Sequence, residues 1–201
     1  MRILQAMAGA DYGGAEEFFV RLAIALNKSD IQQRAVIRWN KSRAQRLRDG
    51  GVKTVELGFG GRLDVATRWK FKRQIADFNP DVVLTWMNRA TLMLPSSGKF
   101  VRVGRLGGYY NLKYYRRCDH LLANTNDILN HLKKNGWDNE KVHYLPNFVA
   151  GKKVPAIERK VYFTPDHAPL ILALGRLHEN KAFDVLFDAM TQLPNAYLWL
   201  P

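Results

Sequence analysis

The sequence predicts an α/β fold, a parallel sheet with helices on both faces. Short apolar runs alternate with segments of helical periodicity, which is typical of βα units. Several runs are apolar throughout rather than alternating, as expected of strands covered on both faces. The 201 residues contain no apolar run approaching the ~20 residues that cross a bilayer. The composition is ordinary for a soluble globular protein, and the length allows one large domain or one domain and part of a second.

Seven short apolar runs mark the expected strands of the first domain. Each is bounded by turn signals or by a segment of helical periodicity. The runs are Ile3–Ala8, Ala35–Trp39, Thr54–Leu57, Val82–Trp86, Val101–Leu106, His120–Asn124 and Val142–Leu145.

Three helices are expected between these strands. Residues 15–27 place an apolar face inward, made of Phe18, Phe19, Leu22, Ala23 and Leu26. Residues 64–78 show a looser stripe and stop before Pro80; the stripe is Ala66, Trp69, Ile75 and Phe78. Residues 125–135 begin at a cap, Asn124 or Thr125, and end at Gly136, with Ile128, Leu129 and Leu132 inward.

The domain limits follow from composition. Residues 1–148 are long enough for a hydrophobic core of their own. Residues 149–168 are polar, contain Pro155 and Pro165, and are expected to link two domains. Residues 169–201 read as a strand, a helix from Phe183 to Leu193 and a second strand from Ala196 to Leu200. We expect them to be the truncated beginning of a nucleotide-binding domain.

The net charge of +13 is concentrated in the first domain. Residues 1–150 carry 25 Lys and Arg against 13 Asp and Glu. Nucleic acid, an anionic membrane or a phosphorylated substrate would each fit this surplus, and so would a well-solvated basic surface. Nucleic acid is the least favoured partner, because no recognised DNA-binding, RNA-binding or zinc motif is present. The single cysteine, Cys118, is expected to be a small buried residue.

Two turns carry residues suited to phosphate. Gly13 and Gly14 precede the first helix, whose free N–H groups favour an anion. Their spacing matches neither the dinucleotide fingerprint nor a Walker A loop, so an NAD site loses support. Gly175 ends a strand and is followed by Arg176 and Lys181, two cations suited to a diphosphate. The alternative in each case is an ordinary turn with surface residues.

The order of these motifs resembles the retaining glycosyltransferases of GT-B fold, group 1 or family 4. The matching segments are 13–16, 124–136, 141–147, 175–181 and Leu193-Pro194. The resemblance implies two Rossmann-like domains facing across a cleft, the second being incomplete here. It also implies transfer of a sugar, with retention, from a nucleotide-sugar donor to a glycan or lipid-linked acceptor in bacterial envelope polysaccharide synthesis.

The resemblance also implies roles for individual residues. Arg176 and Lys181 would bind the donor diphosphate, the loop of Gly13 and Gly14 would line the cleft, and no metal or other cofactor would be needed. Two departures stand out: Ala182 replaces the usual glycine, and residues 105–110 lack the usual histidine. The catalytic residues are therefore unassigned, and His120 and His131 are read as structural or surface residues. The family's paired glutamates would lie beyond residue 201, so we expect the 201 residues alone to be inactive.

A basic stretch suggests a place for the protein in the cell. Cations alternate with aromatic and aliphatic residues between positions 62 and 73; the cations are Arg62, Arg68, Lys70, Lys72 and Arg73. Such a helix suits an anionic membrane, and the resemblance implies a cytoplasmic enzyme peripheral to the inner face of the plasma membrane. Alternatively the helix packs on the sheet and only its outer face is charged. The same two alternatives apply to four other basic residues, Lys41, Arg43, Arg46 and Arg48.

Two other functions remain open at this point. The chain could be a non-catalytic basic α/β module that binds an anionic membrane surface or nucleic acid. It could also be a different GT-B enzyme, such as an epimerase.

Overall fold

The computed structural model describes residues 1–61, 63–149, 151, 153–175 and 177–200. Arg62 and Arg176, two of the predicted site residues, lie outside the described residues. The chain divides into two compact units, Met1–Ala150 and Gly151–Pro201, which are described here separately. Among the described residues, we find no helix with the length and apolar character needed to span a bilayer.

The first unit is built on a sheet of seven parallel strands in the order β3-β2-β1-β4-β5-β6-β7. The strands lie within two residues of the predicted runs at either end, except that β2 begins three residues earlier. Their bounds are β1 Arg2–Met7, β2 Gln32–Arg38, β3 Lys53–Leu57, β4 Val82–Trp86, β5 Val101–Leu106, β6 His120–Ala123 and β7 Val142–Tyr144. The predicted parallel α/β sheet is confirmed.

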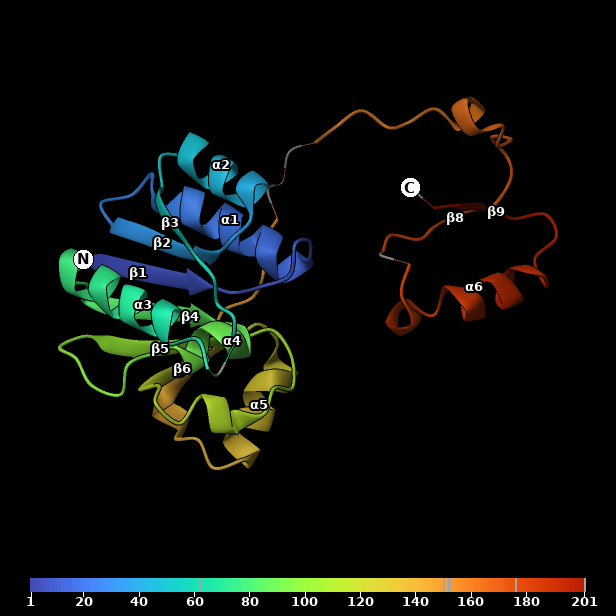
Figure 1. Ribbon diagram of the computed structural model, residues 1–201. Helices are drawn as coiled ribbons and strands as arrows, with labels where there is room; N and C mark the ends of the chain where they lie inside the picture. The colour runs from blue at the N-terminus through green and yellow to red at the C-terminus, as the bar shows by residue number, and fades with distance from the viewer. Residues whose placement is uncertain (62, 150, 152, 176, 201) are drawn as a thin grey trace. The chain divides into compact units, whose positions relative to one another are not determined.

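Helices cover both faces of this sheet (Figure 1). α1 (Gly14–Leu26) and α2 (Lys41–Asp49) pack on one face, while α3 (Val65–Phe78), α4 (Met87–Leu92) and α5 (Asn126–Lys134) pack on the other. Two 3₁₀ turns, η1 (Leu112–Tyr114) and η2 (Asn139–Lys141), lie before β6 and β7. Because successive strand residues point to opposite faces, Leu4 and Ala6 join the α3 side of the core and Met7 joins the α1 side.

One helix face differs from its prediction. In α3 the buried positions are Thr67, Phe71, Ile75 and Phe78, which follow each other at spacings of three and four residues. Ala66 and Trp69, assigned to the inward stripe, are exposed because Phe71 occupies the core position instead. Asp64 caps this helix through the Thr67 N–H, at 2.8 Å.

The predicted start and end of α5 agree with the structure. Thr125 caps α5 by accepting a bond from the Ile128 N–H, and Ile128 and Leu132 are buried. Gly136 follows with a φ of 87°, the left-handed conformation predicted for it. Cys118 is buried as predicted, and burial raises the pKa of its thiol to about 12, so the thiol stays protonated at neutral pH.

The second unit is a small parallel βαβ arrangement. β8 (Leu170–Leu172) pairs with β9 (Tyr197–Trp199), and α6 (Phe183–Met190) lies between them in the chain, three residues shorter than the predicted helix. The 3₁₀ turns are η3 (Arg159–Tyr162) and η4 (Glu179–Lys181). The Trp199 indole N–H donates to Thr164 Oγ1 at 2.9 Å, so part of the stretch assigned to a linker packs within this unit. The domain limits themselves stay a prediction.

Candidate functional site

The strand order places a topological switch point between β1 and β4. The chain proceeds from β1 toward β2 and β3 on one side, and from β4 toward β5, β6 and β7 on the other. In open parallel sheets, ligands bind beyond the carboxyl ends of the strands at such a point. The predicted glycine turn, which joins β1 to α1, therefore lies at the edge of the sheet where a ligand is expected.

The glycine turn is shaped around Glu16, which is buried. The Ala10 N–H donates to Glu16 Oε1 at 2.8 Å, so the carboxylate folds back onto its own loop. Gly9 and Gly13 make room for it, since a Cβ at either position would lie 2.2 or 2.3 Å from a Glu16 oxygen. A Cβ at Gly14 would meet no protein atom within 4 Å. Gly14 thus borders open space at the start of α1, as a ligand-contacting glycine must.

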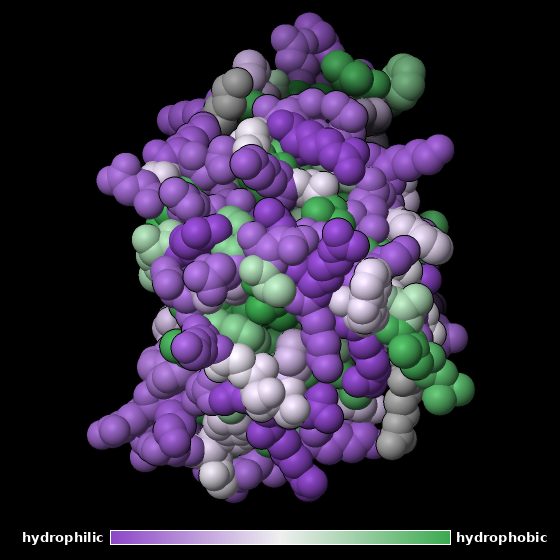
Figure 2. Space-filling view, turned by 60° about the vertical axis from the view of Figure 1, so that its left-hand side comes forward, coloured by the Kyte–Doolittle hydropathy of each residue, from purple (hydrophilic) through white to green (hydrophobic). Residues whose placement is uncertain are grey.

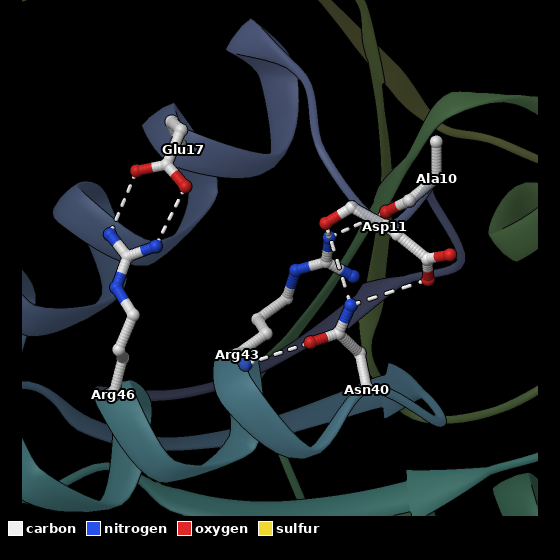
Figure 3. Close-up of polar contacts among 6 residues, drawn as sticks. All are labelled: Ala10, Asp11, Glu17, Asn40, Arg43 and Arg46. Carbon is white, nitrogen blue, oxygen red and sulfur yellow. Dashed lines mark hydrogen bonds and ion pairs between the residues drawn. The ribbon is translucent and has the colours of Figure 1, made fainter.

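The same loop is held from outside by α2 (Figure 3). Arg43 Nη2 donates to the backbone oxygens of Ala10 and Asp11, at 2.5 and 3.0 Å. Asn40 caps α2 by accepting from the Arg43 N–H at 2.8 Å, and its amide lies 3.4 Å from Asp11. Burial lowers the pKa of Arg43 below its ordinary value, with nearby Glu16 opposing that shift. Arg43 is therefore a structural clamp on the loop.

The basic residues of α2 are largely used within the protein. Arg46 makes a two-pronged ion pair with Glu17, both contacts being 2.7 Å, and Arg48 pairs with Glu56 at 3.0 Å. The hydrogen bond from Arg46 is the main reason that the pKa of Glu17 lies below its ordinary value. Arg43 is thus buried in a structural role, whereas Arg46 and Arg48 are exposed and pair with carboxylates at the surface.

A buried arginine was missed by sequence reasoning. Arg105, near the end of β5, is only 2% exposed and its guanidinium stacks over the rings of Phe18 and Trp86, at 4.7 and 4.6 Å. It donates to Asn147 Oδ1 at 2.6 Å. Among the described residues, no carboxylate forms an ion pair with Arg105. Burial lowers its pKa to about 10. The sequence feature that could have revealed Arg105 is its position near the end of a predicted strand, where a charged residue stands among apolar ones.

Of the six buried side-chain polar atoms without a partner in the described residues, three lie at this edge of the sheet. Within the described part of the chain, Asn88 Oδ1, Arg105 Nε and Asn124 Oδ1 are buried without a hydrogen-bond partner. They follow or end β4, β5 and β6, on the same side as the glycine turn. Since buried polar atoms normally find partners, these atoms mark groups that a bound polar ligand could satisfy.

In the second unit, the predicted diphosphate turn is described except for Arg176. Lys181 ends η4 and is exposed, and a Cβ at Gly175 would lie 3.5 Å from Lys181 Cγ and Cδ. The two parts of the motif are therefore neighbours in space. Ala182 adopts a φ of 50°, in the left-handed region that favours glycine. This is the position where the family usually has glycine, and for alanine the conformation costs about 1 kcal/mol.

The basic stretch of α3 combines cations with exposed apolar side chains. Leu63, Val65 and Trp69 are respectively 91%, 72% and 60% exposed. Lys70, Lys72 and Arg73 are also exposed, and Arg68 is half-buried. We call Leu63, Val65, Trp69, Lys70, Lys72 and Arg73 the α3 surface. On the face shown in Figure 2, hydrophobic side chains form separate patches within a mainly hydrophilic surface.

The two histidines considered in the sequence analysis each contact another aromatic side chain. His120 lies on β6 with its Nδ1 3.1 Å from His143 Nε2, and His131 stacks edge-on against Tyr109. In the portion of the chain that the structure describes, no cluster of three or more His, Cys, Asp or Glu is arranged to hold a metal ion. A metal-free site stays a prediction.

Comparison with known proteins identifies the family. The profile of glycosyltransferase family 4 matches residues 12–150, which include the glycine turn, the α2 clamp and Arg105. The chain belongs to glycosyltransferase family 4. Two curated relatives from Rhizobium meliloti (strain 1021) are similar along the whole chain: the lipopolysaccharide core biosynthesis glycosyltransferases LpsD, 32% identical, and LpsE, 34% identical. The chain spans 58% and 59% of their respective lengths.

Solved structures share the fold of this family 4 chain. The complex of Anabaena Alr3699/HepE with UDP and glucose has a TM-score of 0.76 at 16% identity, covering 100% of this chain and 60% of that one. The apo lipopolysaccharide outer core galactosyltransferase WaaB has a TM-score of 0.71 at 20% identity, with the same coverage. These likenesses confirm the predicted fold class.

Proposed function

We propose that this family 4 chain belongs to a glycosyltransferase that moves a sugar from a nucleotide-sugar donor to a glycan or lipid-linked acceptor of the lipopolysaccharide core. The family match across residues 12–150 carries the proposal. It is supported by the names of the two relatives that are similar along the whole chain. The glycine turn at the switch point and the unpaired polar atoms beside it suit an acceptor site. A non-catalytic module is not favoured.

In this proposal the donor binds through the second unit and the configuration of the sugar is retained. Arg176 and Lys181 hold the diphosphate as it leaves, so that two cations and a helix N-terminus replace a metal ion. The proximity of Gly175 and Lys181 supports a single turn that approaches the phosphates. Gly14 borders the transferred sugar from the first unit.

Lys181→Ala tests the donor site. In a chain of the relatives' full length that carries these residues, we expect the affinity for UDP- or GDP-sugars to fall by ~10-fold or more, because one charge-assisted phosphate contact is lost. Arg176→Ala should act in the same direction and more strongly. Isothermal titration calorimetry measures both effects.

Lys153→Ala is the matched control, because Lys153 is another exposed lysine of the second unit. It should leave the affinity unchanged. Unchanged nucleotide binding in both the Lys181→Ala and Arg176→Ala variants would remove the assignment of the diphosphate site, while transfer activity would still report on the family function.

We also propose that the α3 surface docks on an anionic membrane, where a lipid-linked acceptor would be found. Trp69 and Leu63 supply apolar contacts at the interface, and Lys72 and Arg73 supply the main attraction to anionic headgroups. We expect the 201-residue chain to sediment with phosphatidylglycerol vesicles and not with phosphatidylcholine vesicles. The double variant Lys72→Glu, Arg73→Glu should lose most of this binding.

The control is Lys133→Glu, Lys134→Glu, which makes the same change of charge in exposed residues of α5. If both double variants lose binding equally, the attraction is a property of net charge and not of the α3 surface. Duplex DNA in a parallel salt series separates a nucleic-acid partner, and binding to DNA alone would contradict membrane docking.

A further inference from the structure

We propose that a hollow beside the glycine turn binds a neutral saccharide ring of the acceptor, with Trp39 as the surface on which the ring stacks. The inference rests on the proposed glycosyl transfer and adds a subsite to it. The hollow has a volume of about 590 Å³ and lies between the ends of β2 and β3, the loop after β1 and the first turns of α3. The lining residues that carry the argument are Asp11, Arg38, Trp39, Glu56, Asp64 and Lys70.

Trp39 presents a large aromatic ring to solvent at this place. Its side chain is 69% exposed, although its backbone N–H continues the sheet by donating to the Leu57 oxygen at 3.1 Å. Gly58 lies beside the ring, and a Cβ there would be 3.8 Å from Trp39 Cη2, so the absence of a side chain leaves the indole uncovered. The face of an indole is electron-rich and attracts the polarised C–H groups on one face of a pyranose ring.

The rim of the hollow is held in one conformation. Phe59 is buried yet has a φ of 47°, a left-handed conformation that persists only where the surroundings impose it. Its N–H donates to Thr67 Oγ1 at 3.0 Å. Asp64 accepts from the N–H groups of Gly60 and Thr67, at 2.7 and 2.8 Å. Strain of this kind concentrates at ligand sites, and a fixed rim lowers the entropic cost of binding.

Three charged side chains of the lining remain available to a ligand. Glu56 is already engaged by Arg48 at 3.0 Å and by the Asn40 N–H at 3.3 Å. The side chains of Arg38 and Lys70, in contrast, make no hydrogen bond or ion pair with any other residue that the structure describes. Asp11 is exposed and its carboxylate accepts only a long contact, 3.4 Å, from Asn40.

These available groups match the hydroxyls of a sugar. Each hydroxyl both donates and accepts, so a ring is recognised by a mixture of donors and acceptors around an apolar surface. Arg38 and Lys70 supply donors, Asp11 supplies an acceptor and Trp39 supplies the apolar surface. The lining carries three carboxylates against two cations, which disfavours a free phosphate or an acidic lipid headgroup as the occupant.

The test follows the indole N–H signals of the chain in ¹⁵N-correlated NMR spectra. The probe is the core oligosaccharide released from lipopolysaccharide by mild acid. We expect the Trp39 signal to shift during the titration while that of Trp69, a comparably exposed tryptophan on the α3 surface, stays in place. Trp39→Ala should weaken binding at least ten-fold, Trp39→Phe should weaken it about two- to three-fold, and Trp69→Ala should leave it unchanged.

An unmoved Trp39 signal at saturating oligosaccharide would overturn the proposal without any variant. Equal losses in Trp39→Ala and Trp69→Ala would overturn it as well, as would loss of vesicle binding in Trp39→Ala with oligosaccharide binding intact. The family function is tested separately, by sugar transfer in a chain of the relatives' full length. Absence of transfer together with a shifted Trp39 signal would contradict the proposed enzyme and leave the saccharide site standing.

Discussion

Gly9→Ala should lower kcat/KM for sugar transfer by ~100-fold, the scale expected when an active-site group moves by about 1 Å. The added methyl would lie 2.2 Å from Glu16 Oε1 and 2.8 Å from both Cδ and Cγ, so the carboxylate must leave its place. Glu16 would then release the Ala10 N–H, which fixes the course of the loop. The measurement is steady-state kinetics in a chain of the relatives' full length.

Two further variants separate the causes of that loss. The double variant Gly9→Ala, Glu16→Ala removes the atoms that clash, and should recover part of the activity if displacement of Glu16 is responsible. Gly14→Ala introduces no clash with the protein, so any loss of activity in that variant reports contact with a ligand. Near-normal kinetics for Gly9→Ala would show that the loop tolerates movement of Glu16.

Trp86→Ala should destabilise the first unit by about 4 kcal/mol or more. The fully buried indole packs on Phe19, with ring centres 5.2 Å apart, and carries the guanidinium of Arg105 on its face. Removing such a side chain leaves a cavity that typically costs about 3–5 kcal/mol. The loss of its N–H also leaves Gln5 Oε1, now 3.2 Å away, without that donor. Urea unfolding followed by far-UV circular dichroism measures the change.

Comparison with Trp86→Phe shows how much of this loss of stability comes from removing the whole aromatic side chain. The phenylalanine variant keeps one aromatic ring in the core but loses the N–H donor and the volume of the second ring, so the cost should be about 1–3 kcal/mol, less than that of the alanine variant. An alanine variant that loses less than the phenylalanine variant would contradict the assigned packing role.

The sheet was predictable because each strand can be recognised from the residues within it and directly beside it. Val82–Trp86 is a nearly continuous apolar run, Val101–Leu106 keeps Val101, Val103 and Leu106 despite two arginines, and both were placed at their observed limits. Thr125 and Gly136 were likewise readable, because capping chemistry depends on neighbouring residues alone. α2 was not recognised as a helix, because its residues are mainly polar and its role depends on partners in α1 and the glycine loop.

The candidate site was only partly predictable for the same reason. Gly13 and Gly14 were found from their place before a helix, but Glu16 folds back on Gly9 through contacts that no spacing rule reveals. The environment of Arg105 is assembled from α1, β4 and the segment after β7, which are far apart in sequence. The hollow at Trp39 depends on the left-handed conformation of Phe59, a non-glycine residue for which sequence gives no warning.

The amide that receives the Trp86 N–H belongs to a longer series with a consequence for strand pairing. Gln5 in turn donates to Gln33 Oε1 at 3.1 Å, and Gln33 donates to the backbone oxygen of Ala23 in α1. Apolar side chains on parallel strands tolerate a slip of two residues, since the same face stays inward. A series of buried amides does not, because every member would lose its partner at once. These buried hydrogen bonds at the centre of the sheet therefore fix the register of β4, β1 and β2 relative to one another.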